Sequence, residues 1–155
     1  MSSRIKGEFQ KQLQERFLRY VKVDTRSDEA SKTSPSTEKQ KELSKILVDE
    51  LKALGLDDAA MNEFGQVFAT VPSNIPADHP AAGKVPAIGF LAHVDTYFGT
   101  SGKDVKPQII ESYGGGEIRL NESQTLRPED NPNLELCKGH TIIHTDGTTL
   151  LGADD

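Results

Sequence analysis

The sequence predicts an α/β fold in which helices pack on a mixed, largely buried sheet. Two amphipathic helical patterns open the chain, and the remainder is rich in β-forming segments. Residues 85–94 form a nearly continuous apolar run, VPAIGFLAHV, which is typical of a strand covered on both faces. We therefore expect this run at the centre of the sheet. Pro86 should be the first residue of the strand itself, because proline cannot donate to a ladder.

The first helix is predicted over residues 7–23. Its apolar residues recur every four positions, which places one stripe along a helix: Phe9, Leu13, Phe17 and Val21. Residues 24–36 lose this periodicity and collect serine, threonine, aspartate and lysine, so they predict an exposed loop.

The second helix has two possible starts. Pro35 after Ser34 suits a first helical position, and Thr37 with Gln40 matches a capping box. Either start gives the same apolar face: Leu43, Ile46, Leu47, Leu51 and Leu54. Gly55 can adopt the left-handed conformation that ends a helix.

Strands are expected in the rest of the chain. Residues 66–71 are rich in β-formers between Gly65 and Pro72, and residues 109–110 and 118–120 are weaker candidates. An Asp-Gly pair between residues 141–144 and 148–151 predicts a β-hairpin.

Composition excludes several classes of function. The chain has 155 residues, with 24 acidic against 18 basic residues, and the formal charge of −6 argues against a nucleic-acid partner. No apolar run approaches the roughly 18 residues of a membrane span. The N-terminal residues lack the apolar region of a secretory signal, and the single Cys137 agrees with a reducing compartment, so a cytoplasmic location is expected.

His93 and Asp95 are the first candidate functional pair. Residues two apart on a strand point to the same face, so both should project from the carboxyl end of the apolar run. A metal-binding histidine needs an acceptor on its second ring nitrogen, and Asp95 could supply it. The alternative is a histidine that ends a strand and an aspartate that begins a turn.

The second candidate is the GADD sequence at residues 152–155. Small residues let a backbone approach an ion closely, and one carboxylate can bridge two divalent ions, a role we assign to Asp154. The alternative is a helix start, where acidic residues favour the positive end of the dipole.

Four segments together are similar to the peptidase T family, the tripeptide aminopeptidases of the dizinc aminoacylase/carboxypeptidase clan. They are HVDT at 93–96, SGKDVKPQII at 101–110, YGG at 113–115 and TDGTTLLGADD at 145–155. The resemblance implies the N-terminal part of a zinc-exopeptidase-like catalytic domain. Residues 97–100, YFGT, depart from the family pattern on the substrate side.

The resemblance also implies roles for individual residues. His93 resembles a ligand to one zinc, Asp95 the active-site aspartate that orients that histidine, and Asp154 the carboxylate that bridges both zincs. Asp155 is then a neighbour and not a ligand. In that family a metal-bridging water, activated by a glutamate, attacks the carbonyl after the first residue of a tripeptide.

Other parts of such an enzyme would lie beyond Asp155. These are the glutamate pair, a later carboxylate ligand, a histidine ligand and an inserted dimerisation domain. We therefore expect residues 1–155 to be the N-terminal part of the catalytic domain, inactive alone, with the complete enzyme a homodimer. Two alternatives stay open: a related dipeptidase or deacylase of the clan, and a non-catalytic short module.

Three other patterns do not predict sites. Cys137 and His140 lack an orienting acid at a defined spacing, so a surface cysteine is the simpler interpretation. His140 and His144 flank a strand pattern that holds them about 13 Å apart. The glycines at 114–116 lack the pattern of a phosphate-binding loop.

Overall fold

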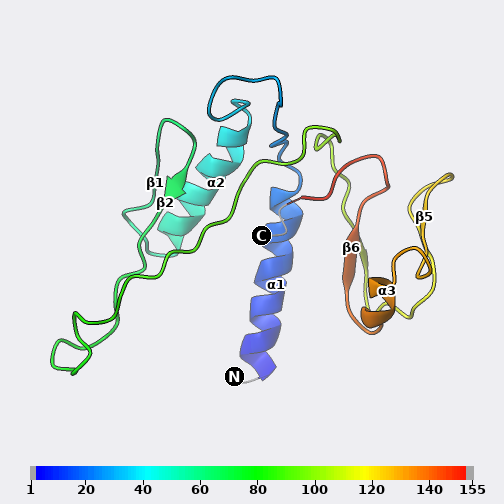
Figure 1. The fold of residues 1–155 in the computed structure, drawn as a ribbon. Coiled ribbons are helices and arrows are strands. Elements are labelled where there is room, and N and C mark those ends of the chain that lie inside the picture. The colour runs from blue at the N-terminus through cyan, green and yellow to red at the C-terminus, as the bar shows by residue number, and fades with distance from the viewer. Residues whose placement is uncertain (1–2, 153–155) are drawn as a thin grey trace.

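A computed structural model describes residues 3–152 of the protein, with side chains from residue 7 onward (Figure 1). Its elements are α1 (Ser3–Tyr20), α2 (Gln40–Ala53), β1 (Ala60–Met61), β2 (Val67–Phe68), β3 (Gln108–Ile110), β4 (Ile118–Arg119), β5 (Thr125–Leu126), α3 (Asn133–Leu136) and β6 (Ile142–His144). The mixture of helices and strands agrees with the predicted α/β class. Within the described residues, no helix has the length and apolar character needed to cross a membrane.

The first helix is confirmed, but its apolar stripe is only partly covered. Phe9 and Leu13 are 56% and 48% exposed, whereas Val21, just past the end of α1, is 5% exposed. The helix is therefore packed at its C-terminal end. There, Arg16, Arg19 and Tyr20 all contact the carboxylate of Glu50 on α2.

The second helix is confirmed and begins later than either predicted start. The Thr37 hydroxyl donates to the Arg26 carbonyl oxygen at 2.9 Å, and α2 begins at Gln40 without a side-chain cap. The capping box is therefore wrong, because a contact distant in sequence engages its hydroxyl. The predicted C-terminus is right: Gly55 has a φ of +89°, and the amide of Leu56 donates to the carbonyl of Leu51.

A short hairpin follows α2 and packs against it. β1 and β2 pair antiparallel, with Ala60 opposite Phe68, which confirms a strand within residues 66–71. Both strands contact α2. The fully buried Ser44 of α2 donates from Oγ to the carbonyl oxygen of Gly65 in the turn at 2.7 Å.

The predicted hairpin around Asp146 and Gly147 is wrong. β6 pairs antiparallel with β3, with Ile109 opposite Ile143, and β4 pairs with β5. Gly147 does form a turn, with a φ of +79°, but the chain then leaves β6 and Leu150 donates to the Ser101 carbonyl. The residues at 146–147 determine the turn locally, whereas the partner of β6 depends on which distant segment packs beside it. The weaker strand predictions at 109–110 and 118–120 are confirmed by β3 and β4.

The predicted central strand at residues 85–94 is also wrong for the described structure. Ile88 is 76% exposed, and Phe90 and Leu91 are each 96% exposed. The run is drawn in Figure 1 without a strand arrow, and the bridge between Thr96 and Arg26 comes only after it. An apolar run becomes a buried strand only when neighbouring strands and a covering layer exist. The described strands instead form separate two-stranded pairs, so packing on one buried sheet is not confirmed.

Candidate functional site

His93 and Asp95 lie together at the end of the exposed run. The Nδ1 atom of His93 is 3.2 Å from Oδ1 of Asp95, and the two side chains are 65% and 46% exposed. The alternation of an extended backbone places both side chains on one face. The pair has the geometry in which a carboxylate fixes the orientation and tautomer of an imidazole ring.

The backbone just after this pair is held by the loop that follows α1. Thr96 forms a parallel bridge with Arg26, and its amide donates to the Thr25 carbonyl at 3.2 Å. The carbonyl oxygen of Thr96 accepts two hydrogen bonds from Ser27, from the amide at 2.9 Å and from Oγ at 2.8 Å. The loop therefore fixes the position of Thr96, next to Asp95.

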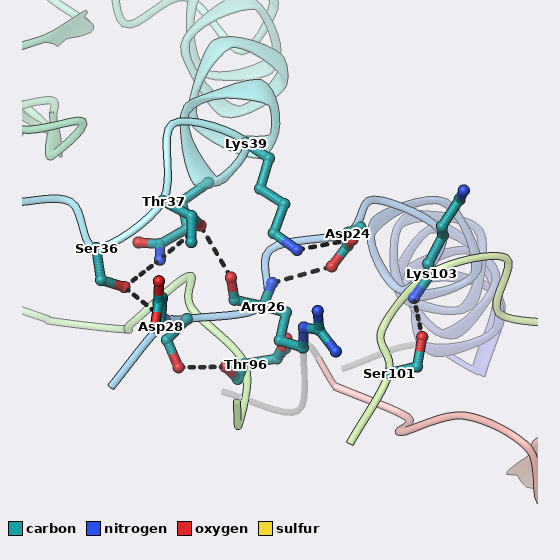
Figure 2. A network of polar contacts seen from close by, with 11 residues as sticks. Asp24, Arg26, Asp28, Ser36, Thr37, Lys39, Thr96, Ser101 and Lys103 are labelled. Atoms are coloured by element: carbon teal, nitrogen blue, oxygen red, sulfur yellow. Dashed lines mark hydrogen bonds and ion pairs between the residues drawn. The ribbon is translucent and has the colours of Figure 1, made fainter. Parts of the chain in front are cut away.

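The loop is in turn tied to the start of α2. Lys39 Nζ lies 2.8 Å from Oδ2 of Asp24, and Asp28 donates its amide to Ser36 Oγ at 3.1 Å (Figure 2). Burial of the Asp24 carboxyl opposes its ionisation, but hydrogen bonds from Lys39 and from the Arg26 amide outweigh it, so the pKa of Asp24 is lowered.

The serine, threonine, aspartate and lysine residues at 24–36 predict an exposed loop, and that prediction misses the role of this segment. Thr25 is only 2% exposed, and the residues that anchor the site lie here. Serine, threonine and aspartate are common both in free loops and in polar networks. Their partners are far away in sequence, so no local signal distinguished the two cases.

A cavity of about 340 Å³ adjoins the pair. His93, Asp95 and Tyr97 contribute to its wall, together with mostly apolar side chains that include Val21, Leu43, Leu47, Val105 and Leu150. The lining residues come from the end of α1 and the loop after it, from α2, from residues 92–105 and from residues 150–152. The cavity therefore combines a polar histidine–aspartate edge with an apolar interior.

The second predicted site is approached by the end of the described chain. A Cβ atom added at Gly152 would lie 2.6 Å from Cγ2 of Thr96, so the backbone of Gly152 lies close to the Thr96 side chain. Leu150 is held nearby by its amide bond to the Ser101 carbonyl at 2.8 Å. Asp154 itself lies outside the described residues.

The described residues alone do not form a complete metal site. No group of three or more histidine, cysteine, aspartate and glutamate side chains in this part of the chain could hold a metal ion. A catalytic zinc site commonly takes three protein ligands. His93 and Asp95 offer one imidazole and one carboxylate, which is fewer groups than such a set needs.

The other histidines and the cysteine are placed elsewhere. His144 ends β6, is 8% exposed, and its Nδ1 atom lies 2.8 Å from the Thr145 carbonyl oxygen. His140 is exposed, and Cys137 directly follows α3.

Comparison with known proteins gives a consistent result. No family model matches the chain. A protein of Bacillus subtilis strain 168 called peptidase T is 58% identical over 143 residues, which are 91% of this chain and 33% of that protein. The chain resembles peptidase T. The peptidase T of Geobacillus thermodenitrificans is 55% identical over 93% of this chain and that of Alkaliphilus oremlandii 52% over 94%.

The similarity covers most of this chain but only part of each relative. The chain spans about a third of the length of the peptidase T proteins that it matches. The resemblance to peptidase T that the four sequence segments indicate is therefore confirmed.

Proposed function

We propose that this chain carries part of the active site of a zinc-dependent tripeptide aminopeptidase, an enzyme that releases the N-terminal residue of a tripeptide. The observation that carries the proposal is the His93–Asp95 contact of 3.2 Å at the edge of a cavity, in a chain that resembles peptidase T. Tripeptides are the proposed substrates, and the reaction is hydrolysis of the first peptide bond.

His93 is the proposed zinc ligand and Asp95 the residue that positions it. Since the Asp95 carboxylate engages Nδ1, the ring would bind a metal through Nε2. A carboxylate on the second nitrogen keeps that proton in place and raises the basicity of the ligating nitrogen. Asp95 would therefore act through His93.

Asp154 is the proposed second ligand, and its carboxylate would bridge two zinc ions. The close contact between Gly152 and Thr96 supports this assignment. Asp154 comes two residues after Gly152 in the sequence, and two residues of extended chain span at most about 7 Å. When bound, a zinc pair lowers the pKa of a water molecule and stabilises the oxyanion that forms during hydrolysis.

The remaining ligands and the general base are proposed to come from polypeptide that corresponds to the rest of the longer relatives. The absence of a three-ligand group within residues 3–152 supports this division. We propose that residues 1–155 belong to the N-terminal part of the catalytic domain and do not hydrolyse tripeptides alone. The dimerisation domain, the homodimer and the cytoplasmic location stay predictions.

A chimera tests the proposal. This chain would replace the matching third of Bacillus subtilis peptidase T, and hydrolysis of tripeptides, dipeptides and N-acyl amino acids would be measured with and without a zinc chelator. We expect zinc-dependent release of the first residue from tripeptides, lost by at least 100-fold in His93→Ala, on the scale of losing one metal-site group.

The matched control is His79→Ala, since His79 is another exposed histidine, and its ring nitrogen Nδ1 accepts a hydrogen bond from the Ala81 amide, away from the candidate site. It should hydrolyse tripeptides at the parent rate. Preference for dipeptides or N-acyl amino acids would contradict the tripeptidase assignment in favour of a related hydrolase. A folded, inactive chimera would favour the non-catalytic module.

A further inference from the structure

Two aromatic side chains stand directly beside the candidate site. Tyr97 and Phe98 follow Asp95 and Thr96 in the chain, and their ring centroids are 4.7 Å apart at an interplanar angle of 50°. They are 58% and 41% exposed. This tilted pair lies in the segment that departs from the family pattern, so the family resemblance leaves its role open.

Gly99 allows the Tyr97 ring to lie where it does. A Cβ atom at residue 99 would be 2.5 Å from Cε1 and 2.7 Å from the hydroxyl oxygen of Tyr97. The ring therefore folds back over the backbone of Gly99, a position that any larger residue would push it out of. Gly99 thereby provides a way to displace the ring without removing it.

The two rings contribute to different cavities. Tyr97 lines the apolar cavity that His93 and Asp95 also line. Phe98 lines a second, polar cavity together with Arg26, Asp28 and Lys39. Tyr97 is therefore the member of the pair that a molecule bound beside His93 would touch, and Phe98 supports it from the side.

We propose that Tyr97 is a specificity-determining residue, and that the cavity beside it takes the apolar or aromatic side chain of the first residue of a peptide substrate. This inference rests on the proposed peptidase function and names its preferred substrates. The first residue carries the carbonyl that is attacked, and its side chain branches from the neighbouring carbon. A carbonyl held near His93 therefore places that side chain in the adjoining cavity.

The composition of the cavity favours an apolar occupant. Apart from His93 and Asp95 at one edge, its described wall carries no charged side chain, and most of the rest is aliphatic. Its volume of about 340 Å³ lies within the range of small-molecule sites, roughly 300–1,000 Å³. An aromatic wall adds ring contacts that a glycine side chain cannot make.

The test measures binding, without turnover. The 155-residue chain would be titrated with Phe-Gly-Gly, Leu-Gly-Gly and Gly-Gly-Gly, and the ring signals of Tyr97 and Phe98 followed by NMR. We expect Phe-Gly-Gly to bind about threefold to tenfold more tightly than Gly-Gly-Gly, which is the ratio that one aromatic contact commonly gives. Phe-Gly-Gly should also shift the Tyr97 ring signals.

Three variants decide whether Tyr97 causes the preference. Tyr97→Ala should bring the ratio of the two dissociation constants close to one, and Gly99→Ala should lower it while the ring remains present. Phe64→Ala removes another exposed aromatic outside both cavities and should leave the ratio unchanged. Circular dichroism would verify that each variant is folded.

An unchanged ratio in Tyr97→Ala would overturn the inference, as would no binding of either peptide to the folded chain. These failures are separable from failure of the proposed function. If the chimera hydrolyses tripeptides equally well whatever their first residue, the inference about Tyr97 is contradicted and the proposed function is not. If Phe-Gly-Gly binds selectively through Tyr97 but the chimera is inactive, the proposed function is contradicted and the inference is not.

Discussion

The Nζ atom of Lys39 lies 2.8 Å from Oδ2 of Asp24, and this ion pair joins the start of α2 to the loop that follows α1. The two side chains are 33% and 26% exposed. The other carboxylate oxygen of Asp24 accepts the Arg26 amide at 3.1 Å. One carboxylate therefore both anchors the loop and shapes the turn that presents its backbone to Thr96.

Replacing Asp24 by asparagine should lower the free energy of unfolding at pH 7 by about 1 kcal/mol, the usual worth of a partly buried charged hydrogen bond. The pKa of Asp24 is lowered in the folded chain, because the bonds from Lys39 and Arg26 outweigh the effect of burial. Its contribution is therefore present above the unfolded pKa of 3.8 and is lost as pH falls through the folded value. Urea unfolding from pH 7 to pH 3 measures both effects.

The control for this experiment is Asp57→Asn, which changes an exposed aspartate. The difference between parent and Asp24→Asn should shrink toward zero at the acidic end, while Asp57→Asn stays near the parent at pH 7. A difference for Asp24→Asn that grows as pH falls would contradict the assigned ion pair.

Ser44 should be far more sensitive to substitution than its neighbour. Ser44 is fully buried, and its hydroxyl is 2.7 Å from the carbonyl oxygen of the buried Gly65. Ser44→Ala leaves that carbonyl without this bond, which should cost about 1–3 kcal/mol of unfolding free energy. Lys45→Ala, at the exposed next position, should cost less than about 0.5 kcal/mol. Equal losses in denaturant unfolding would contradict the α2–hairpin contact.

A substitution in the exposed apolar run at 85–94 distinguishes the buried strand that the sequence predicts from the exposed segment in the structure. Phe90 is 96% exposed, so Phe90→Ser should change the free energy of unfolding of this chain by less than about 0.5 kcal/mol. A strand covered on both faces would instead lose about 3–5 kcal/mol on truncation of a phenylalanine. The variant should also bind less of a hydrophobic dye, because exposed apolar surface is removed.

The Tyr20 hydroxyl should lose its proton at a higher pH than an ordinary tyrosine. Burial, and then its hydrogen bond to Glu50, raise the pKa of Tyr20 to about 12. A raised pKa means that the contribution of Tyr20 to stability is present below the unfolded value of 10.0 and is lost as pH rises toward about 12. Absorbance at the phenolate band from pH 9 to pH 12.5 should show a late component that Tyr20→Phe removes. Its persistence in that variant would assign it to another tyrosine.

The local elements were largely predictable from the sequence, because their causes are local. A repeat of four identified α1, Gly55 ended α2, and β-branched residues marked β3. The partners of the strands were not predictable in the same way. Residues 141–144 are followed by the Asp146-Gly147 turn, which favours a hairpin with residues 148–151. The strand β6 pairs instead with β3, which lies more than 30 positions earlier.

The residues of the candidate site also differ in whether local sequence could predict them. His93 and Asp95 were found because alternation along an extended backbone is a property of the chain itself. Asp24, Ser27 and Lys39 were missed because each acts through a partner that the sequence does not place beside it.

The sequence by itself determined α1 and α2, the turn at Gly147, the His93–Asp95 pair and the similarity to peptidase T, but not the short α3. Only the tertiary structure decided that the run at 85–94 is exposed, that Thr96 is held by Ser27, and that the Tyr97 ring lines a cavity beside His93. Periodicity and turn chemistry act over a few residues, whereas burial and hydrogen-bond partners depend on which distant segments meet in space.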